Sequence, residues 1–132
     1  MQDNPNINIL LEAIQDLLMK EILPAIKDNE GLAYKTLVSW NMLGVISREV
    51  KMGEVFLNSE IQSIAAYLKE NVSINNQTYA EKMDLCRNLN QKLNESILKN
   101  KSSIENLEVW NLVKNSLKEK LEISNPRYNT GD

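Results

Sequence analysis

The chain has 132 residues, a formal net charge of −3, and 42% hydrophobic and 25% charged residues. This composition fits one globular domain with a substantial core, and its acidic balance argues against a general nucleic-acid binder, which needs a basic face to replace phosphate counterions. Histidine is absent and Cys86 is the only cysteine. A Ser–His or Cys–His catalytic pair, an internal disulfide and a cysteine-pair zinc site are therefore excluded within this chain.

The sequence contains no membrane-spanning or secretory pattern. No segment approaches the roughly 18–20 continuous apolar residues that a transmembrane helix needs, and the first residues lack the basic and apolar regions of a signal peptide. We therefore expect a cytoplasmic protein that does not enter a membrane.

Apolar periodicity predicts two helices in the first part of the chain. The first begins near Asn4 or Asn6, which are suitable N-cap residues. It should end or kink at Pro24, because proline disfavours helical geometry in the residue before it. A second, unusually apolar helix is predicted over about 32–52, with Gly53 as a plausible residue just past its end.

A third helix and a fourth are predicted from capping residues and a polar interval. Asn58 or Ser59 can cap the third helix, and the polar sequence over 72–77 is expected to form a loop. Thr78 followed by Glu81 is a capping-box pattern, which favours the start of the fourth helix at this point.

A fifth helix completes the predicted fold. Ser102 and Glu105 form a second capping-box pattern before it, and the Asn-Pro pair at 125–126 should end it. Short connections between consecutive helices favour antiparallel neighbours. We predict an all-α fold, an up-and-down bundle of about five helices, as a single domain over 1–132 with 125–132 as a C-terminal tail.

Asn41 and Arg48 are polar residues on an otherwise apolar stripe of the second predicted helix. The stripe has helical three- and four-residue spacing and consists of Tyr34, Leu37, Val38, Asn41, Val45 and Arg48. If the stripe faces a core, its polar groups need partners, because burying an unpaired amide costs roughly 1–3 kcal/mol. We interpret Asn41 as a buried pin that fixes helix register, and a ligand contact as the less favoured alternative.

Two interpretations stay open for Arg48, which is followed by Glu49. One is an ordinary ion pair, for example with Glu21 of the first helix. The other is a contact with a carboxylate or phosphate of a partner or ligand, to which the planar guanidinium is suited.

The tryptophans and the C-terminal residues also allow two interpretations each. Trp40 and Trp110 are expected in the core, although Trp40 is also a candidate interface anchor. The sequence after the last helix, Asn125 to Tyr128, is either a helix stop with the tyrosine folded back, or an exposed hook. Arg127 and Tyr128 would form that hook, because arginine and tyrosine are enriched in binding hot spots.

A pattern at both ends and in the second helix gives a family resemblance. It comprises, in chain order, Met1-Gln2-Asp3 with Pro5, Leu10-Leu11 with Ala13-Ile14, Glu21 with Leu23-Pro24-Ala25, Asn41 with Arg48-Glu49, and Lys120-Leu121 with Asn125-Pro126-Arg127-Tyr128. With these residues the chain resembles a bacterial family of small proteins labelled as a domain of unknown function. Its members are typically encoded beside an aminoglycoside-phosphotransferase-like kinase and an acyl-CoA dehydrogenase-like enzyme.

The resemblance implies a role that depends on a partner. In levulinate-type catabolism, a similar protein is a small subunit needed with its kinase to phosphorylate the hydroxyl of a 4-hydroxyacyl-CoA. The dehydrogenase-like enzyme then removes the phosphate. The chain departs from the family pattern at Leu37, where an arginine is expected, and at Trp40, where a small residue is expected.

The expected function is therefore a non-catalytic accessory subunit of such a kinase, with the acyl-CoA substrate as a second candidate contact. No catalytic residue, metal ligand set, cofactor site or Gly-rich phosphate loop is predicted. The predicted partner- or ligand-binding residues are Trp40, Asn41, Arg48, Glu49, Asn125, Arg127 and Tyr128. The alternatives are a stand-alone acyl-CoA-binding bundle, with Arg48 on a phosphate or carboxylate, and a self-associating helical bundle.

Overall fold

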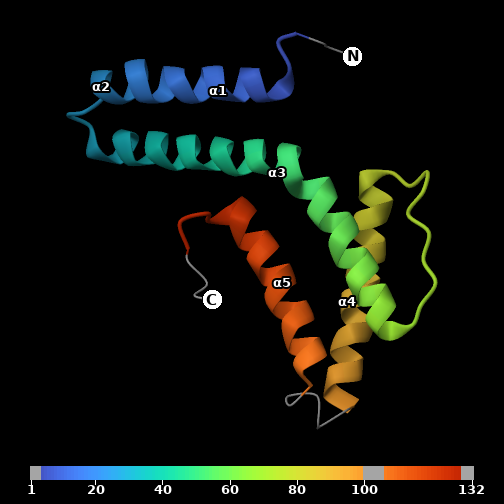
Figure 1. Cartoon of the computed structure of the whole chain (residues 1–132). Helices are drawn as coiled ribbons and strands as arrows, with labels where there is room; N and C mark the ends of the chain where they lie inside the picture. Colours follow the sequence, from blue (N-terminus) through green and yellow to red (C-terminus); the bar gives the residue numbers. More distant parts are fainter. Residues whose placement is uncertain (1–3, 100–105, 129–132) are drawn as a thin grey trace. The chain divides into compact units, whose positions relative to one another are not determined.

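The computed structural model describes residues 4–99 and 106–128, and every regular element in these residues is helical (Figure 1). The predicted all-α fold class is confirmed, with a helix count close to the predicted one. The elements are α1 (Ile7–Leu17), the π-helical segment η1 (Leu18–Ile22), α2 (Leu23–Ala25), α3 (Glu30–Leu68), α4 (Tyr79–Lys99) and α5 (Leu107–Ser124). None of these described helices has the length and apolar character needed to span a membrane.

The chain forms two compact units, Met1–Lys51 and Met52–Asp132, and α3 contributes residues to both. We describe each unit by itself. The expected single domain over 1–132 stays a prediction, and the last residues of the expected tail, 129–132, lie outside the described part of the chain.

The first unit is an antiparallel helical hairpin of α1 and the first part of α3 (Figure 1). Asn6 caps α1 as predicted, since its side-chain oxygen accepts a hydrogen bond of 3.0 Å from the backbone N–H of Ile9. The regular α-helix gives way to η1 and then to the short α2, which contains Pro24. The helical run ends at Ala25, close to the predicted position, but Leu23 before the proline keeps right-handed helical angles, contrary to the expectation.

The predicted gap between the second and third helices is wrong, because α3 is continuous from Glu30 to Leu68. Gly53 is buried inside this helix rather than just past its end. A glycine in a helix interior costs only about 1 kcal/mol relative to alanine. The buried side chains of Leu57 and Ile61, one and two turns further on, provide packing that offsets this cost.

A left-handed backbone conformation at the next residue ends helix α3. Lys69 has a φ of 57°, in the left-handed region, and the N–H of Glu70 donates to the carbonyl of Ala65 at 2.9 Å. Such a residue closes the last turn of a helix and satisfies its free carbonyl groups. The residues predicted as a polar loop, 72–77, indeed contain no helix.

The start of α4 is the predicted capping box. The carboxylate of Glu81 accepts from the backbone N–H of Thr78 at 2.7 Å, and the Thr78 hydroxyl accepts in return from the N–H of Glu81 at 3.3 Å. These reciprocal bonds satisfy backbone donors that the first helical turn leaves free.

Helix α5 begins and ends with asparagine. Asn106 accepts from the N–H of Glu108 at 3.0 Å, whereas the predicted capping box of Ser102 and Glu105 lies outside the described residues. The N–H of Asn125 donates to the carbonyl of Leu121 at 2.8 Å. The predicted end of this helix is confirmed.

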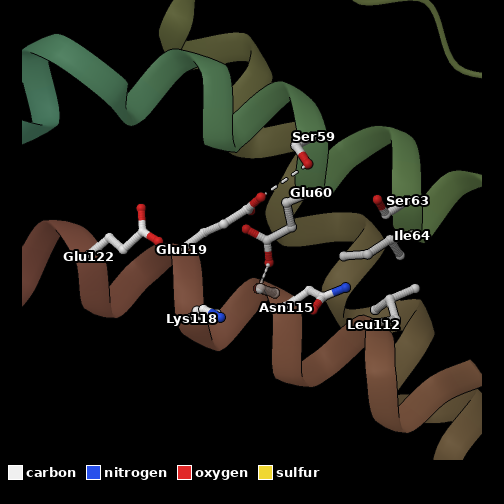
Figure 2. Close-up of a pocket in the computed structure, with 10 residues that line it drawn as sticks. Ser59, Glu60, Ser63, Ile64, Leu112, Asn115, Lys118, Glu119 and Glu122 are labelled. Carbon is white, nitrogen blue, oxygen red and sulfur yellow. Dashed lines mark hydrogen bonds between the residues drawn. The ribbon is translucent and has the colours of Figure 1, made fainter. Parts of the chain in front are cut away.

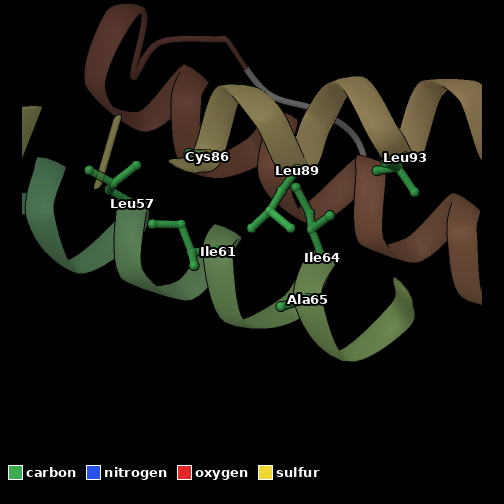
Figure 3. Packing of buried hydrophobic residues seen from close by; sticks show 7 residues of the cluster. All are labelled: Leu57, Ile61, Ile64, Ala65, Cys86, Leu89 and Leu93. Atoms are coloured by element: carbon green, nitrogen blue, oxygen red, sulfur yellow. The ribbon is translucent and has the colours of Figure 1, made fainter. Parts of the chain in front are cut away.

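The core of the second unit lies between α3 and α4. Figure 3 shows its buried residues, which are Leu57, Ile61, Ile64 and Ala65 on α3 and Cys86, Leu89 and Leu93 on α4. The three- and four-residue intervals on each helix place these side chains on one face, so that the two faces pack together. Ile61, Ile64 and Leu89 are the largest side chains that are completely buried.

We predict that Leu89→Ala lowers the free energy of unfolding by about 2–5 kcal/mol, because it leaves a cavity in this core. Leu98→Ala on the same helix is the matched control, because Leu98 is 72% exposed, and should change the stability by less than about 0.5 kcal/mol. Urea denaturation followed by circular dichroism measures both. Equal effects of the two substitutions would contradict the packing described here.

Candidate functional site

The predicted binding residues of the second helix lie on α3 in the first unit. Trp40 and Arg48 are half-buried, whereas Asn41 and Glu49 are exposed. The interpretation of Asn41 as a buried pin is therefore wrong. Periodicity showed correctly that Asn41 shares a helix face with Tyr34, but that face is exposed rather than turned to a core: Tyr34 is 69% exposed.

The side of α3 that meets α1 is formed around Trp40, Gly44 and Ser47. The side-chain Nε2 of Gln15 on α1 donates to the main-chain oxygen of Trp40 at 3.0 Å. A Cβ atom at position 44 would lie 3.3 Å from this Nε2 and 3.3 Å from Nη1 of Arg48. The absence of a side chain at Gly44 thus lets Gln15 reach the backbone of the neighbouring helix.

Sequence analysis missed this contact. A glycine inside an apolar helical pattern is a signal of close packing, but it does not say which residue approaches. The partner, Gln15, is 25 positions from Trp40 in the sequence. A second contact between the two helices joins Lys51 Nζ to Glu12 Oε1 at 3.4 Å; as an exposed pair it contributes little stability.

The C-terminal candidates belong to the second unit. After Asn125, the N–H of Tyr128 donates to the Asn125 carbonyl at 2.9 Å and forms a turn. Arg127 is exposed, and the Tyr128 side chain is 61% exposed. The tyrosine therefore does not fold back onto the helices, and the role of Arg127 and Tyr128 as a hook for a partner stays a prediction. Trp110 was expected in the core, but it is 64% exposed.

Large apolar side chains are exposed along both helices of the first unit. They are Ile7, Ile9, Leu10, Ile14, Leu17 and Ile22 in the α1–η1 part, and Leu32, Tyr34, Leu37, Val38, Met42, Ile46 and Val50 on α3. We call this set the hairpin surface. Within the described part of this unit, only Leu11, Thr36 and Ser47 are buried. Extensive exposed apolar surface marks interaction sites on soluble proteins.

The second unit contains a pocket of about 360 Å³ between α3 and α5 (Figure 2). It is lined by Ser59, Glu60, Ser63, Ile64, Leu112, Asn115, Ser116, Lys118, Glu119 and Glu122. The lining carries three carboxylates and one ammonium group, so its charge is unfavourable for an anionic ligand. The hydroxyl of Ser59 donates to Glu119 across the pocket at 3.2 Å.

Glu60 is a buried carboxylate at the meeting point of three helices. One of its oxygens, Oε1, accepts hydrogen bonds from Lys120 Nζ at 2.7 Å, Ser116 Oγ at 2.9 Å and Asn90 Nδ2 at 3.1 Å. Burial alone would raise the pKa of the carboxyl. The hydrogen bonds from Lys120, Asn90 and Ser116 and the positive charge of Lys120 outweigh it and hold the pKa of Glu60 below its ordinary value.

Cys86 lies beside the Glu60 carboxylate, and its thiol has low reactivity. Burial, together with the negative charge and hydrogen bonding of Glu60, raises the pKa of the Cys86 thiol to about 11. The thiol is therefore protonated at neutral pH and is a poor nucleophile. In the described residues, no group of three or more Cys, Asp or Glu side chains is arranged to hold a metal ion.

Residues 24–128 match the family described as Domain of unknown function (DUF6285). The chain belongs to this family. The match begins at Pro24 and includes every predicted binding residue from Trp40 to Tyr128, whereas α1 precedes it. No curated protein and no solved structure matches the chain.

The contact at Gly44 gives a test by double-mutant cycle. Alanine at this position should gain up to about 1 kcal/mol from helix propensity, but its methyl group must displace the Gln15 amide. We expect Gly44→Ala to be more stabilising by roughly 0.5–1 kcal/mol in a Gln15→Ala background than in the parent chain. Thermal denaturation of the four proteins measures this coupling.

Gly31→Ala provides the matched control for this cycle. The nearest atom to a Cβ at position 31 is Asn29 Oδ1 at 3.8 Å, so this substitution should be additive with Gln15→Ala. Additivity in the Gly44 cycle as well would show that the close approach has no energetic consequence.

The pKa of Glu60 predicts a pH dependence of stability. Because the pKa is lower in the folded state than the roughly 4.3 of an unfolded glutamate, the stabilisation is complete above about pH 4.3. It is lost as the pH falls through the lower folded-state value. Glu60→Gln should cost about 1–3 kcal/mol at pH 7, from the charged hydrogen bond to Lys120, and clearly less at pH 3.

Urea denaturation at both pH values measures the difference between parent and variant. Glu122→Gln is the control, since Glu122 lines the same pocket but is exposed; it should have little effect at either pH. A Glu60→Gln effect of equal size at pH 7 and pH 3 would contradict the assignment of an ionised buried carboxylate.

Proposed function

We propose that this chain is a non-catalytic accessory subunit that supports an aminoglycoside-phosphotransferase-like kinase in phosphorylating a hydroxyacyl-CoA. The observation that supports a subunit role is the exposed hairpin surface of the first unit. The identity of the kinase comes from the family resemblance of the sequence.

The first unit buries too few side chains to be stable through its own packing. Isolated helices are marginal in water, and most helical stability in proteins comes from packing of an apolar face. Leu11 is the only large apolar side chain buried within the described residues of this unit. A further protein surface that covers the exposed side chains would supply the missing burial, at about 25 cal/mol for each Å² removed from water.

Helix α3 carries a ridge that suits another helix. Val38, Met42, Ile46 and Val50 follow at four-residue intervals and are 39–58% exposed. Rows of side chains at this spacing form the ridges that fit the grooves of a neighbouring helix. The hairpin therefore offers a surface for helical packing rather than a site for chemistry.

The predicted binding residues fit this role. Asn41 and Glu49 are exposed on the same helix as the ridge, and Arg48 carries a planar donor group suited to carboxylates and phosphates. Arg127 and Tyr128 are exposed in the second unit. We propose that these residues, with Trp40 and Asn125, contact the kinase.

The subunit would act without supplying an acid, a base or a nucleophile. Histidine is absent, Cys86 is protonated at neutral pH, and Glu60 is already engaged by three donors. The chain would instead stabilise the kinase, shape its acyl-CoA site or hold it closed over the substrate. Such positioning contributes to catalysis by orienting reactants and excluding water.

Independent acyl-CoA binding by this chain has less support. The 360 Å³ pocket is the larger of the two described in the second unit, but Glu60, Glu119 and Glu122 on its wall would repel the phosphates of coenzyme A. We therefore favour a protein partner for the hairpin surface over a nucleotide-bearing ligand in the pocket.

Co-expression with an aminoglycoside-phosphotransferase-like kinase of the kind encoded beside family members tests the proposal. We expect the two proteins to co-purify and the kinase to phosphorylate hydroxyacyl-CoA faster with the subunit than without it. Sedimentation of the pure chain reports whether it covers its own hairpin surface by self-association. The proposal fails if the kinase does not co-purify and its activity is unchanged by this chain.

Charged substitutions on the ridge locate the contact. Met42→Glu combined with Ile46→Glu should weaken kinase binding by at least about tenfold, because two carboxylates would enter an apolar contact. Leu98→Glu is the matched control: Leu98 is exposed on α4 and belongs to the second unit. Equal loss of binding in the control would show that the ridge is not the contact.

A further inference from the structure

We propose that α5 is a detachable helix that opens as a unit while the α3–α4 core of the second unit stays folded. What holds α5 is the Glu60 cluster, defined as Glu60, Asn90, Ser116 and Lys120, more than apolar packing. This inference concerns the second unit alone and does not depend on the proposed kinase partner. It rests on four observations, which concern burial, unfilled space, hydrogen bonding and the exposed face of the helix.

Helix α5 contributes little to the apolar core. The seven buried residues of the core cluster all belong to α3 and α4, and α5 adds only the partly buried Leu112 to that cluster. Val109 is the one buried apolar residue of α5 itself. Since apolar burial is the main stabilising contribution to helix packing, α5 is attached less strongly than α3 and α4 are to each other.

The contact of α5 with its neighbours is incompletely filled. The pocket of about 360 Å³ lies between α3 and α5 (Figure 2), and a second pocket of about 170 Å³ involves α3, α4 and α5. Both are lined by Glu60, Ile64, Leu112 and Ser116. Asn115 and Glu122 in the larger pocket are exposed, so water rather than another side chain meets this part of α5.

The remaining attachment is polar, and water can replace it. Opening of α5 removes Ser116 and Lys120 from the Glu60 carboxylate, while Asn90 on α4 can stay. Water then solvates the carboxylate and the ammonium group, so the net loss is much smaller than the intrinsic strength of these bonds. Separating α3 from α4 would instead expose completely buried side chains such as Ile61 and Leu89.

The outward face of α5 does not hold the helix in place within this unit. Leu107 and Trp110 on this face are 64–70% exposed, and Val113 and Leu117, which line the second pocket instead, are still 43–54% exposed. Opening would add Val109 and Leu112 to the exposed apolar residues, and would widen the second pocket, which Ile64 and Leu93 already line, while α4 continues to cover them. The open state is therefore the state in which α5 can exchange its intramolecular contacts for others.

Native-state hydrogen exchange of the full chain tests the inference. An isolated helix is marginal in water, so a detached α5 loses its intrahelical hydrogen bonds, and amides in its middle, over 113–121, should exchange through this local opening with a weak dependence on denaturant. Amides over 61–65 of α3 and 86–93 of α4 should exchange at least about tenfold more slowly, through a larger opening. Equal protection and equal denaturant dependence in all three helices would overturn the proposal.

Two substitutions in the Glu60 cluster sharpen the test. Glu60→Gln and Lys120→Met should each raise exchange in α5 by at least about fivefold, which reflects a weakened charged hydrogen bond, with a smaller change in α4. The two variants weaken the same contact from α5 and from α3: Lys120→Met changes a side chain that is 58% exposed and leaves Ser116 and Asn90 as donors to Glu60, whereas Glu60→Gln removes the buried charge itself.

Lys92→Met is the matched control. Lys92 on α4 pairs with Glu70 at 2.8 Å, outside the Glu60 cluster, so this variant should leave α5 exchange unchanged relative to α4. If Lys120→Met accelerates exchange in α4 as much as in α5, the helix does not open separately and the proposal is wrong.

Discussion

The side chains of Ile61, Ile64 and Leu89 hold α3 against α4, and the second unit is arranged around this contact. Its apolar burial offsets the cost of Gly53 inside α3, and α5 packs against the two helices that it joins. Glu60 lies next to Ile61 in the sequence, but its side chain is charged rather than apolar. It brings a negative charge into the same region, and that charge is tolerated because donors from α4 and α5 converge on it.

The two parts of α3 illustrate how one helix can have two environments. Within the second unit its apolar face is covered by α4, whereas within the first unit most of its large side chains are exposed. On the side of α3 that meets α1, Gly44 and Ser47 are small, and the Gln15 amide reaches past Gly44 to the Trp40 main chain. Gly44 thus allows the close approach of α1 and α3, whereas most large apolar side chains of this part of α3 stay exposed.

Local signals in the sequence were sufficient for most helix ends. Asn6, Pro24, and the pair of Thr78 and Glu81 act on backbone groups within four residues, so their effect can be predicted without knowing the fold. The helix end predicted at Gly53 was wrong because tertiary packing outweighed the low helix propensity of glycine. Asn41 misled because periodicity identifies residues that share a face but not what covers that face. The Glu60 cluster left no local signal, since the donors lie 30–60 positions away.

Cys86 gives the second unit an internal reporter. It is the only cysteine of the chain, and it is buried in the α3–α4 core. Its thiol is adjacent to Glu60, and its sulfur accepts a hydrogen bond from Asn90 Nδ2 at 3.4 Å. An alkylating reagent can reach such a sulfur only when the surrounding helices separate, and the high pKa slows the reaction further. The rate of alkylation in the native protein therefore records how often the core itself becomes accessible, without any label having to be introduced.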